Sequence, residues 1–78
     1  STSLYPTIAS DEVKLSVPQA QAYYEIIVYD KLGRNVLQRA IMGSSVHTLN
    51  ISSLDYGNYM LVLLDEAGRK QTMRFLKK

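Results

Sequence analysis

Residues 55–64 read Asp-Tyr-Gly-Asn-Tyr-Met-Leu-Val-Leu-Leu, and this stretch decides the fold prediction. Its second part, residues 59–64, is apolar at every position, which is typical of a strand in the middle of a sheet with both faces covered. Asp55 and Gly57 are turn-forming residues and precede this run. The stretch therefore predicts a turn followed by a central strand, the next to last in the chain.

The position of Tyr59 predicts the kind of sheet structure to which this strand belongs. In immunoglobulin-like sandwiches, a tyrosine near the start of the next-to-last strand lies two residues before a core position, and its hydroxyl bonds to the backbone just upstream. Leu61 stands at that core position here. We therefore predict an all-β fold, an immunoglobulin-like Greek-key β-sandwich of about seven strands.

The rest of the chain follows the same strand pattern. Apolar residues recur with a period of two, and turn residues interrupt them about every eight to twelve positions. The expected inward-facing sets are Val13, Leu15 and Val17; Tyr24, Ile26 and Val28; Leu49 and Ile51; and Met73 and Phe75. Pro18 is expected to end the first of these strands because its nitrogen cannot donate to a sheet. Residues 36–41 are predicted as a strand without an assigned inward face, and Leu4-Tyr5 as a short first strand.

The pattern Asp-x-x-Gly-Arg occurs twice, at residues 30–34 and 65–69. Each copy lies between two apolar runs, as a hairpin turn does. The Asp side chain can accept hydrogen bonds from backbone N–H groups at the start of the turn, and Gly can adopt the left-handed conformation that closes it. We interpret the repeat as one turn rule used twice and not as the duplication of a larger unit.

Length and composition limit what the chain can do. With 78 residues, 46% of them hydrophobic, it can form one thin core but no roomy internal pocket. It has no cysteine, so a disulfide and a thiolate metal site are excluded. No apolar run approaches the roughly 18 residues of a membrane helix. The chain begins without Met or a leader, so we expect residues 1–78 to be a single domain excised from a longer protein.

Catalytic and metal-binding chemistry is not indicated. The single histidine, His47, shares a predicted strand face with Leu49 and Ile51, where a half-buried structural role is much commoner than metal ligation. No Gly-rich phosphate-binding loop is present, and a net charge of +2 is low for a nucleic-acid-binding domain. We therefore predict no enzymatic activity, no cofactor, no nucleic-acid partner and no direct membrane insertion.

The positive charge is unevenly distributed along the chain. Five of the nine Lys and Arg residues fall within the last ten positions: Arg69, Lys70, Arg74, Lys77 and Lys78. One interpretation is an edge strand whose charge prevents unwanted strand pairing, and the other is a surface that docks a partner. An open edge over residues 70–77 would also leave dimerisation available, although the charges disfavour it.

Four blocks of sequence follow one another in a characteristic order. They are Leu4-Tyr5-Pro6 with Ala9-Ser10-Asp11, the block Tyr29-Asp30-Lys31-Leu32-Gly33-Arg34-Asn35-Val36, the block Ile51-Ser52-Ser53-Leu54-Asp55-Tyr56-Gly57-Asn58-Tyr59, and the segment from Gly68 to Phe75-Leu76-Lys77-Lys78. Together they resemble the type A C-terminal sorting domain of the type IX secretion system, also called the Por secretion system. Thr7-Ile8 stands where that family usually has Asn-Pro, a departure that affects only the expected first turn.

The resemblance implies a role in protein export without catalysis. The domain would be recognised in the periplasm by outer-membrane type IX components, namely the translocon, a shuttle and a sortase-like signal peptidase. The cargo would then reach the cell surface or be secreted, usually after the domain is cut off and often with attachment to lipopolysaccharide. The resemblance gives Gly68, Arg69, Phe75, Lys77 and Lys78 as candidate recognition residues, and Asp30, Gly33, Arg34, Gly57 and Tyr59 as fold-keeping motif residues. Removal of residues 75–78 is expected to abolish export and leave most of the sandwich folded.

Other functions stay open at this point. Within the family, the domain is either a discarded signal or a retained module of a surface-located component of the machinery. Outside the family, an immunoglobulin-like adhesion or carbohydrate-binding module would need an aromatic platform, for which Tyr23 and Tyr29 share a predicted outward face with Ile27. The last alternative is a purely structural spacer.

Overall fold

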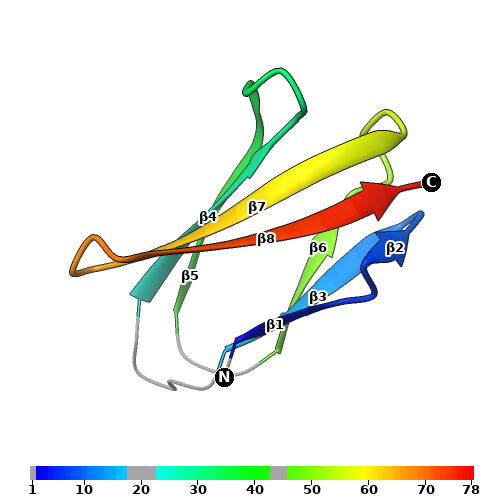
Figure 1. The fold of residues 1–78 in the computed structure, drawn as a ribbon. Coiled ribbons are helices and arrows are strands. Elements are labelled where there is room, and N and C mark those ends of the chain that lie inside the picture. Colours follow the sequence, from blue (N-terminus) through cyan, green and yellow to red (C-terminus); the bar gives the residue numbers. More distant parts are fainter. Residues whose placement is uncertain (1, 18–22, 43–45) are drawn as a thin grey trace.

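The chain folds into two β-sheets that face each other across one hydrophobic core (Figure 1). The computed structural model describes residues 2–17, 23–42 and 46–78, apart from the side chain of Tyr23. These residues form no helix that could span a membrane. The predicted all-β class is confirmed, and the described residues form eight strands, one more than the expected number of about seven. The strands are β1 Ser3–Tyr5, β2 Ile8–Ala9, β3 Glu12–Ser16, β4 Tyr23–Tyr29, β5 Asn35–Met42, β6 Val46–Asn50, β7 Gly57–Asp65 and β8 Lys70–Lys77.

The strands divide into a three-stranded and a five-stranded sheet. The first has the order β1-β3-β6 and is antiparallel throughout. The second has the order β2-β8-β7-β4-β5 and is antiparallel except for the β2–β8 pair. Residues 3–9 therefore contribute to both sheets, because β1 pairs in one sheet and β2 in the other.

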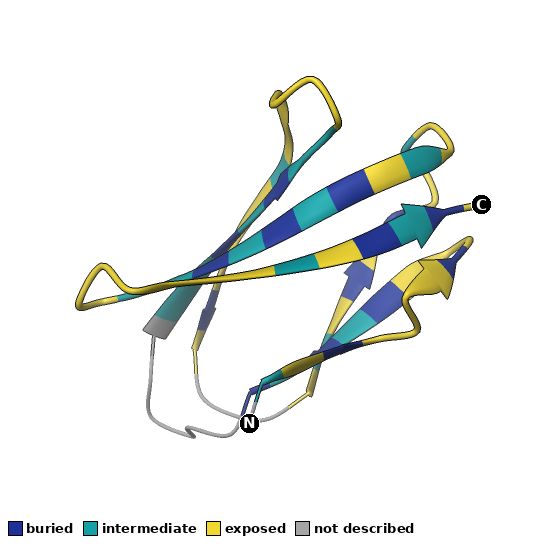
Figure 2. Ribbon diagram, viewed as in Figure 1, coloured by how far each residue is buried: buried dark blue, intermediate teal, exposed yellow. Residues whose placement is uncertain are grey.

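Alternating apolar and polar side chains decide which face of each strand is buried (Figure 2). The predicted inward-facing sets are confirmed, and their fully buried members are Val13, Leu15, Val17, Ile26, Val28, Leu49 and Ile51. Phe75 is buried as well, while Tyr24 and Met73 pack partly buried against the same core. β3 ends at Ser16, and Pro18, which was predicted to end it, lies outside the described residues.

β7 is the central strand of the five-stranded sheet, as predicted, with β8 on one side and β4 on the other. Its inward residues are Tyr59, Leu61 and Leu63, and its outward apolar residues are Met60, Val62 and Leu64. The outward residues are half-buried by their neighbours on the same sheet. The run of apolar residues in the sequence therefore supplies both faces of one strand.

β5 shows the inward face that the sequence left unassigned. Ile41 is buried and Leu37 packs partly buried against the core, whereas Val36 and Ala40 are exposed. The register between β4 and β5 shifts next to Tyr29, where an irregularity allows the strands to enter the turn. Positions 37, 39 and 41 of β5 therefore lie on the side of the strand that faces the core, and the register shift ends this alternation before Asn35.

β8 is an open edge only along its first part. β2 pairs with its second part, opposite Leu76 and Lys77. In addition, the N–H groups of Leu76 and Lys78 donate to the carbonyls of Thr7 and Ala9 at 2.7 and 2.8 Å. The prediction of a free edge over residues 70–77 is therefore wrong for the last residues of the strand, because the N-terminal segment covers them.

Candidate functional site

Segments that are far apart in the sequence meet at one end of the sandwich, which we call the motif pole. It consists of residues 8–9, the turn 30–34, the loop and strand start 51–59, and residues 75–78. The sheet registers bring these segments together, since Gly57 lies opposite Lys77 and Ile8 lies opposite Leu76. Tyr29, which leads into the turn, pairs with β7 near the same end. Figure 1 shows the tip of the β4–β5 hairpin, the loop before β7 and the C-terminus on this side, and the β7–β8 turn at the opposite end.

The 30–34 turn is held together by the carboxylate of Asp30. Its Oδ1 accepts hydrogen bonds from the N–H groups of Leu32 and Arg34, both at 2.9 Å. Its Oδ2 accepts a hydrogen bond from Arg34 Nε at 2.7 Å, so the same two residues form an ion pair. Gly33 has a φ of 82°, in the left-handed region that glycine adopts without steric cost. The turn chemistry predicted from the sequence is confirmed here.

The 65–69 turn repeats this arrangement at the opposite end of the molecule. Asp65 Oδ1 accepts hydrogen bonds from the N–H groups of Ala67 and Arg69 at 2.9 Å, and Oδ2 accepts one from Arg69 Nε at 2.9 Å. Gly68 takes the same left-handed conformation, with a φ of 84°. Because both turns use the same bonds, turn chemistry alone does not distinguish the motif pole from the opposite end.

The carboxylates of Asp30 and Asp65 both have a pKa below the ordinary value of 3.8. The largest cause in each case is a hydrogen bond from the backbone N–H of the Arg four residues later, and the guanidinium of that Arg lowers the pKa further. The ionised carboxylates therefore stabilise the fold at pH values above their ordinary pKa. This contribution is lost as the pH falls through the lowered pKa.

We expect the Tm of the domain to decrease as the pH is lowered from about 5, because protonation of Asp30 and Asp65 weakens both turns. The decrease should be smaller in the variant Asp30→Asn/Asp65→Asn, which has no carboxylate to protonate at these positions. Thermal unfolding followed by circular dichroism over this pH range measures the effect. Asp11→Asn/Glu66→Gln is the control and should keep the wild-type dependence. An equal decrease in the two double variants would contradict the assignment.

Tyr59 fixes the loop that enters β7. Its hydroxyl donates a hydrogen bond to the carbonyl of Asp55 at 2.6 Å, and its buried ring stacks on Phe75 with centroids 5.5 Å apart. Gly57, which lies between Asp55 and Tyr59 in the sequence, has a φ of 144°, a value that residues with a Cβ rarely adopt. Burial, followed by the nearby carboxylate of Asp55, raises the pKa of Tyr59, so the hydroxyl keeps its proton and stays a donor. The predicted tyrosine corner is therefore confirmed.

Tyr59→Phe is expected to lower the free energy of unfolding by about 1 kcal/mol, because the corner hydrogen bond is lost while the stacking on Phe75 is kept. Urea unfolding measures the change. Tyr56→Phe is the matched control, because the Tyr56 side chain is exposed and its hydroxyl should contribute nothing measurable. Equal unfolding midpoints for wild type and Tyr59→Phe would show that the corner bond is not stabilising.

A cleft of about 250 Å³ lies between the 30–34 turn and the loop before β7. Two apolar side chains at this cleft, Leu32 and Tyr56, are 71% and 85% exposed. Lys31, Arg34 and Asp55 add charged groups of both signs to its lining. Exposed apolar side chains beside hydrogen-bonding groups can hold a short segment of another protein.

The five predicted fold-keeping residues all lie at the motif pole. They are Asp30, Gly33 and Arg34 in the turn, and Gly57 and Tyr59 at the start of β7. Each has a local bonding or conformational role in the structure, and four of the five also line the cleft. We predict that each of the five residues stabilises the fold, and the variants described above test this for Asp30 and Tyr59.

The five predicted recognition residues, in contrast, are divided between the two ends of β8. Gly68 and Arg69 belong to the 65–69 turn, whereas Phe75, Lys77 and Lys78 lie at the motif pole. Phe75 and Lys77 are only 2% and 8% exposed, and Lys77 Nζ donates a hydrogen bond to the carbonyl of Lys78 at 2.8 Å. Of the set, Gly68, Arg69 and Lys78 are exposed. These residues therefore do not form one contact surface.

The position of Phe75 argues against the expectation that residues 75–78 can be removed with most of the sandwich left intact. The Phe75 ring is part of the core and stacks on Tyr59. The same four residues also supply the hydrogen bonds from Leu76 and Lys78 to the N-terminal segment. The deleted segment is therefore structural as well as a candidate signal.

Three further side chains concern the alternative functions, namely His47 for a metal site and Tyr23 and Tyr29 for an aromatic platform. His47 is half-buried on β6, as predicted, and its Nε2 is buried without a hydrogen-bond partner in the part of the chain that the structure describes. No group of three or more His, Cys, Asp or Glu side chains among the described residues is placed to hold a metal ion. Tyr29 faces outward and is half-buried, but the side chain of Tyr23, the other half of the suggested aromatic platform, lies outside the described residues.

The cleft and its two exposed apolar side chains were not predicted from the sequence. Leu32 lies within a hairpin turn and Tyr56 within a loop, where polar residues and glycine are usual. These departures from turn composition were visible in the sequence. No pattern along the chain, however, indicates that positions 32 and 56 lie at the same cleft.

Fold and site together define a small two-sheet β domain with a surface cleft at the pole where its motif residues gather. A family model described as the secretion system C-terminal sorting domain matches residues 3–78. The chain therefore belongs to this family, the C-terminal sorting domains of type IX secretion. No curated protein matches the chain. Family membership supports a role as a sorting signal, which implies contact with the secretion machinery and passage to the outer membrane, the cell surface or the medium. The family is not an enzyme family.

Proposed function

We propose that this domain directs an attached cargo across the outer membrane through the type IX secretion system, and that the machinery recognises the folded domain at its motif pole. The observation that carries the proposal is the meeting of distant sequence blocks at one end of the sandwich. The 65–69 turn makes the same hydrogen bonds at the other end, so the turn chemistry of residues 30–34 does not depend on the motif pole. Besides the packing and hydrogen bonds made there, a shared binding role accounts for the gathering of the blocks.

The strand order supports the finer assignment of the fold as an immunoglobulin-like Greek key. In such sandwiches the first, second, fourth and fifth strands of the seven share one sheet, the third, sixth and seventh share the other, and variable-type domains add strands beside the third. Here β1, β3 and β6 form one sheet, and β4, β7 and β8 are neighbours in the other. β2 and β5 extend the second sheet at its two edges.

The proposal gives the candidate recognition residues different roles according to their positions. Lys78 is exposed at the motif pole and is available for contact. Phe75 and Lys77 position it, through packing on Tyr59 and through the Nζ hydrogen bond to its carbonyl. Gly68 and Arg69 close the β7–β8 hairpin and act on recognition through the fold.

The proposed partners are the translocon, a shuttle and a sortase-like signal peptidase. The domain would pass through the periplasm and then be cut off, with the cargo anchored at the cell surface. The alternative is a retained domain that tethers a machinery component at the surface. Mass spectrometry of the mature surface protein distinguishes the two, because peptides from residues 1–78 are present only if the domain is retained.

A reporter fusion tests the proposed function. Residues 1–78 are placed behind a periplasmic reporter in a host that has a type IX system. The reporter is expected at the cell surface, and it should stay in the periplasm of a matched strain that lacks the translocon. Periplasmic retention of the intact, folded fusion in the secreting host would overturn the proposal.

A further inference from the structure

The outward face of the five-stranded sheet has an apolar centre. We call this centre the outer stripe, and its residues are Ile27, Tyr29, Met60, Val62 and Leu64. Ile27 lies opposite Val62 and Tyr29 opposite Met60 in the β4–β7 register, so the side chains form one contiguous patch across two central strands. The three-stranded sheet packs against the other face (Figure 1). All five residues keep part of their surface accessible to solvent.

The β8 side of the outer stripe is basic. Lys70 lies opposite Leu64 and Arg74 lies opposite Met60, so both cations are on the outward face. Both are exposed, and neither takes part in an ion pair within the described residues. This side of the face therefore carries positive charge that nothing in the described chain neutralises.

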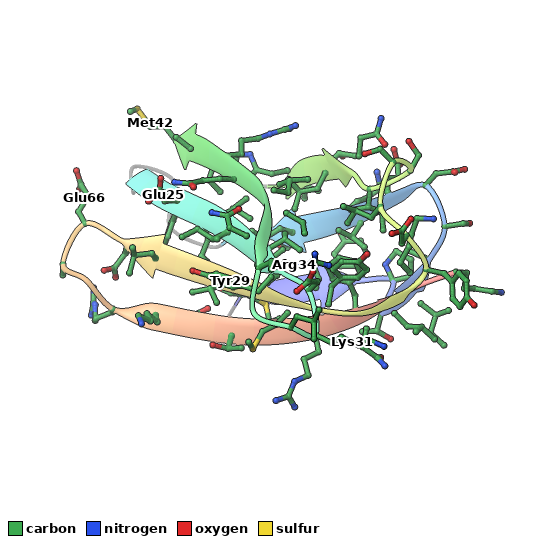
Figure 3. The ribbon with its side chains drawn as sticks, turned by 90° about the horizontal axis from the view of Figure 1, so that it is seen from above. Glu25, Tyr29, Lys31, Arg34, Met42 and Glu66 are labelled. Carbon is green, nitrogen blue, oxygen red and sulfur yellow. The ribbon has the colours of Figure 1, made fainter. Side chains whose placement is uncertain are left out.

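The β5 side of the outer stripe is occupied by a polar network without positive charge. Gln38 Nε2 donates a hydrogen bond to Glu25 Oε2 at 2.6 Å, and Asn35 Nδ2 donates one to Gln38 Oε1 at 2.9 Å. Figure 3 shows Glu25 and Tyr29 on the same strand, β4. The face is therefore asymmetric, with cations along one side and satisfied polar groups along the other.

The face is hollowed at the end next to the motif pole. A cavity of about 300 Å³ is lined there by Met60, Tyr59, Lys31 and Arg74, among others. Lys31 comes from the 30–34 turn (Figure 3) and Arg74 from β8, so two cations from different elements flank one hollow. Lys31 also has no ion pair within the described residues. The hollow suits an apolar side chain that has a carboxylate beside it.

We infer that this face binds an acidic, apolar segment of a partner protein, with its carboxylates along β8. The apolar side chains of the segment cover the outer stripe, and one of them enters the hollow. Its carboxylates pair with Lys70, Arg74 and Lys31. This inference rests on the proposed function, because the partner is then a component of the secretion machinery that grips the sheet beside the motif pole.

A second copy of this chain fits the face less well. Each copy presents three cations without ion pairs, Lys31, Lys70 and Arg74, and one carboxylate, Glu25, which is already bonded to Gln38. Two such faces in contact would bring an excess of like charges together, which is unfavourable at an interface. The charge of the face therefore selects an acidic partner.

The test uses the reporter fusion with a charge reversal on the face, Lys70→Glu/Arg74→Glu. The matched control, Lys14→Glu/Arg39→Glu, changes the net charge equally but alters cations away from the face. Lys14 lies on the three-stranded sheet, and Arg39 pairs with the inward-facing position of Ile26. Export of the face variant is expected to fall by about tenfold, whereas the control stays near wild type. All four residues are solvent-accessible, and the Lys14–Glu12 ion pair that the control removes is exposed, so both variants should keep a Tm close to that of wild type.

A second variant tests the apolar part of the face. Ile27→Thr/Val62→Thr keeps β-branched side chains in both strands but removes apolar contact, and it should also reduce export while the domain stays folded.

Each outcome decides between the claims. If wild type is not exported, the proposed function fails; if wild type and the face variant are exported equally, only the present inference fails. Equal losses in the face variant and its control would also overturn it, since the position of the charges would then be irrelevant. If the purified domain dimerises through this face, the face binds a second copy of the chain, and the inference of an acidic partner is wrong.

Discussion

Deletion of residues 75–78 is expected to unfold the domain. Phe75 is 2% exposed, and truncation of a buried Phe to Ala alone costs about 3–5 kcal/mol. That cost is comparable to the total stability of about 4–12 kcal/mol expected for a chain of this length. The deletion also removes the hydrogen bonds from Leu76 and Lys78 that join β8 to the N-terminal segment. Thermal unfolding followed by circular dichroism should show no cooperative transition.

Deletion of Lys78 alone is the control for this experiment. It removes one exposed side chain, the backbone hydrogen bond from Lys78 to Ala9 and the hydrogen bond from Lys77 Nζ to the Lys78 carbonyl, and it should leave a cooperative transition close to that of wild type. A wild-type transition in the 75–78 deletion would contradict the placement of Phe75 in the core. If the deletion does unfold the domain, its loss of export reports on folding and not on recognition.

Leu61→Ala is expected to lower the free energy of unfolding by about 2–5 kcal/mol. Leu61 is fully buried at the centre of β7, where neighbouring strands hold the backbone and the cavity cannot collapse completely. Urea unfolding measures the change through the shift in midpoint. For a domain of this size, the loss should leave a substantial unfolded fraction at 37 °C.

Leu64→Ala makes the same substitution on the outward face of the same strand. Leu64 is only half-buried and faces away from the core, so the expected loss is about 1 kcal/mol. Equal losses at positions 61 and 64 would show that the two faces of β7 are wrongly assigned.

The parts of the fold that the sequence predicted are those set by local chemistry. The alternation of Val13, Leu15 and Val17 follows from the two-residue period of a strand. The 30–34 and 65–69 turns follow from Asp and Gly at fixed spacing, and the Tyr59 corner follows from its distance to the upstream carbonyl. Each of these signals involves residues within a few positions of one another.

β2 could not be predicted because its signal is not local. Ile8-Ala9 is too short to show a period, and it becomes a strand only because it pairs with Leu76 and Lys77 at the other end of the chain. That pairing also explains why the predicted free edge of β8 was partly wrong.

The candidate recognition residues of the closing hairpin looked like one site because they are close in sequence. A strand rises about 3.4 Å per residue, which separates Arg69 from Lys78 by roughly 30 Å.

Recognition at the motif pole is tested most directly by the export of two surface variants of the reporter fusion. Leu32→Ser/Tyr56→Ser removes the exposed apolar side chains of the cleft. Met42→Ser/Val46→Ser removes two exposed apolar side chains, 71% and 49% accessible, at the opposite end of the sandwich. Both variants should keep the wild-type Tm, because exposed side chains contribute little to stability.

Export of the Leu32→Ser/Tyr56→Ser fusion is expected to fall by about tenfold, as for the loss of roughly 1.4 kcal/mol of binding free energy. Export of the Met42→Ser/Val46→Ser fusion should stay at the wild-type level. Wild-type export of both fusions, or an equal loss in both, would contradict recognition at the motif pole.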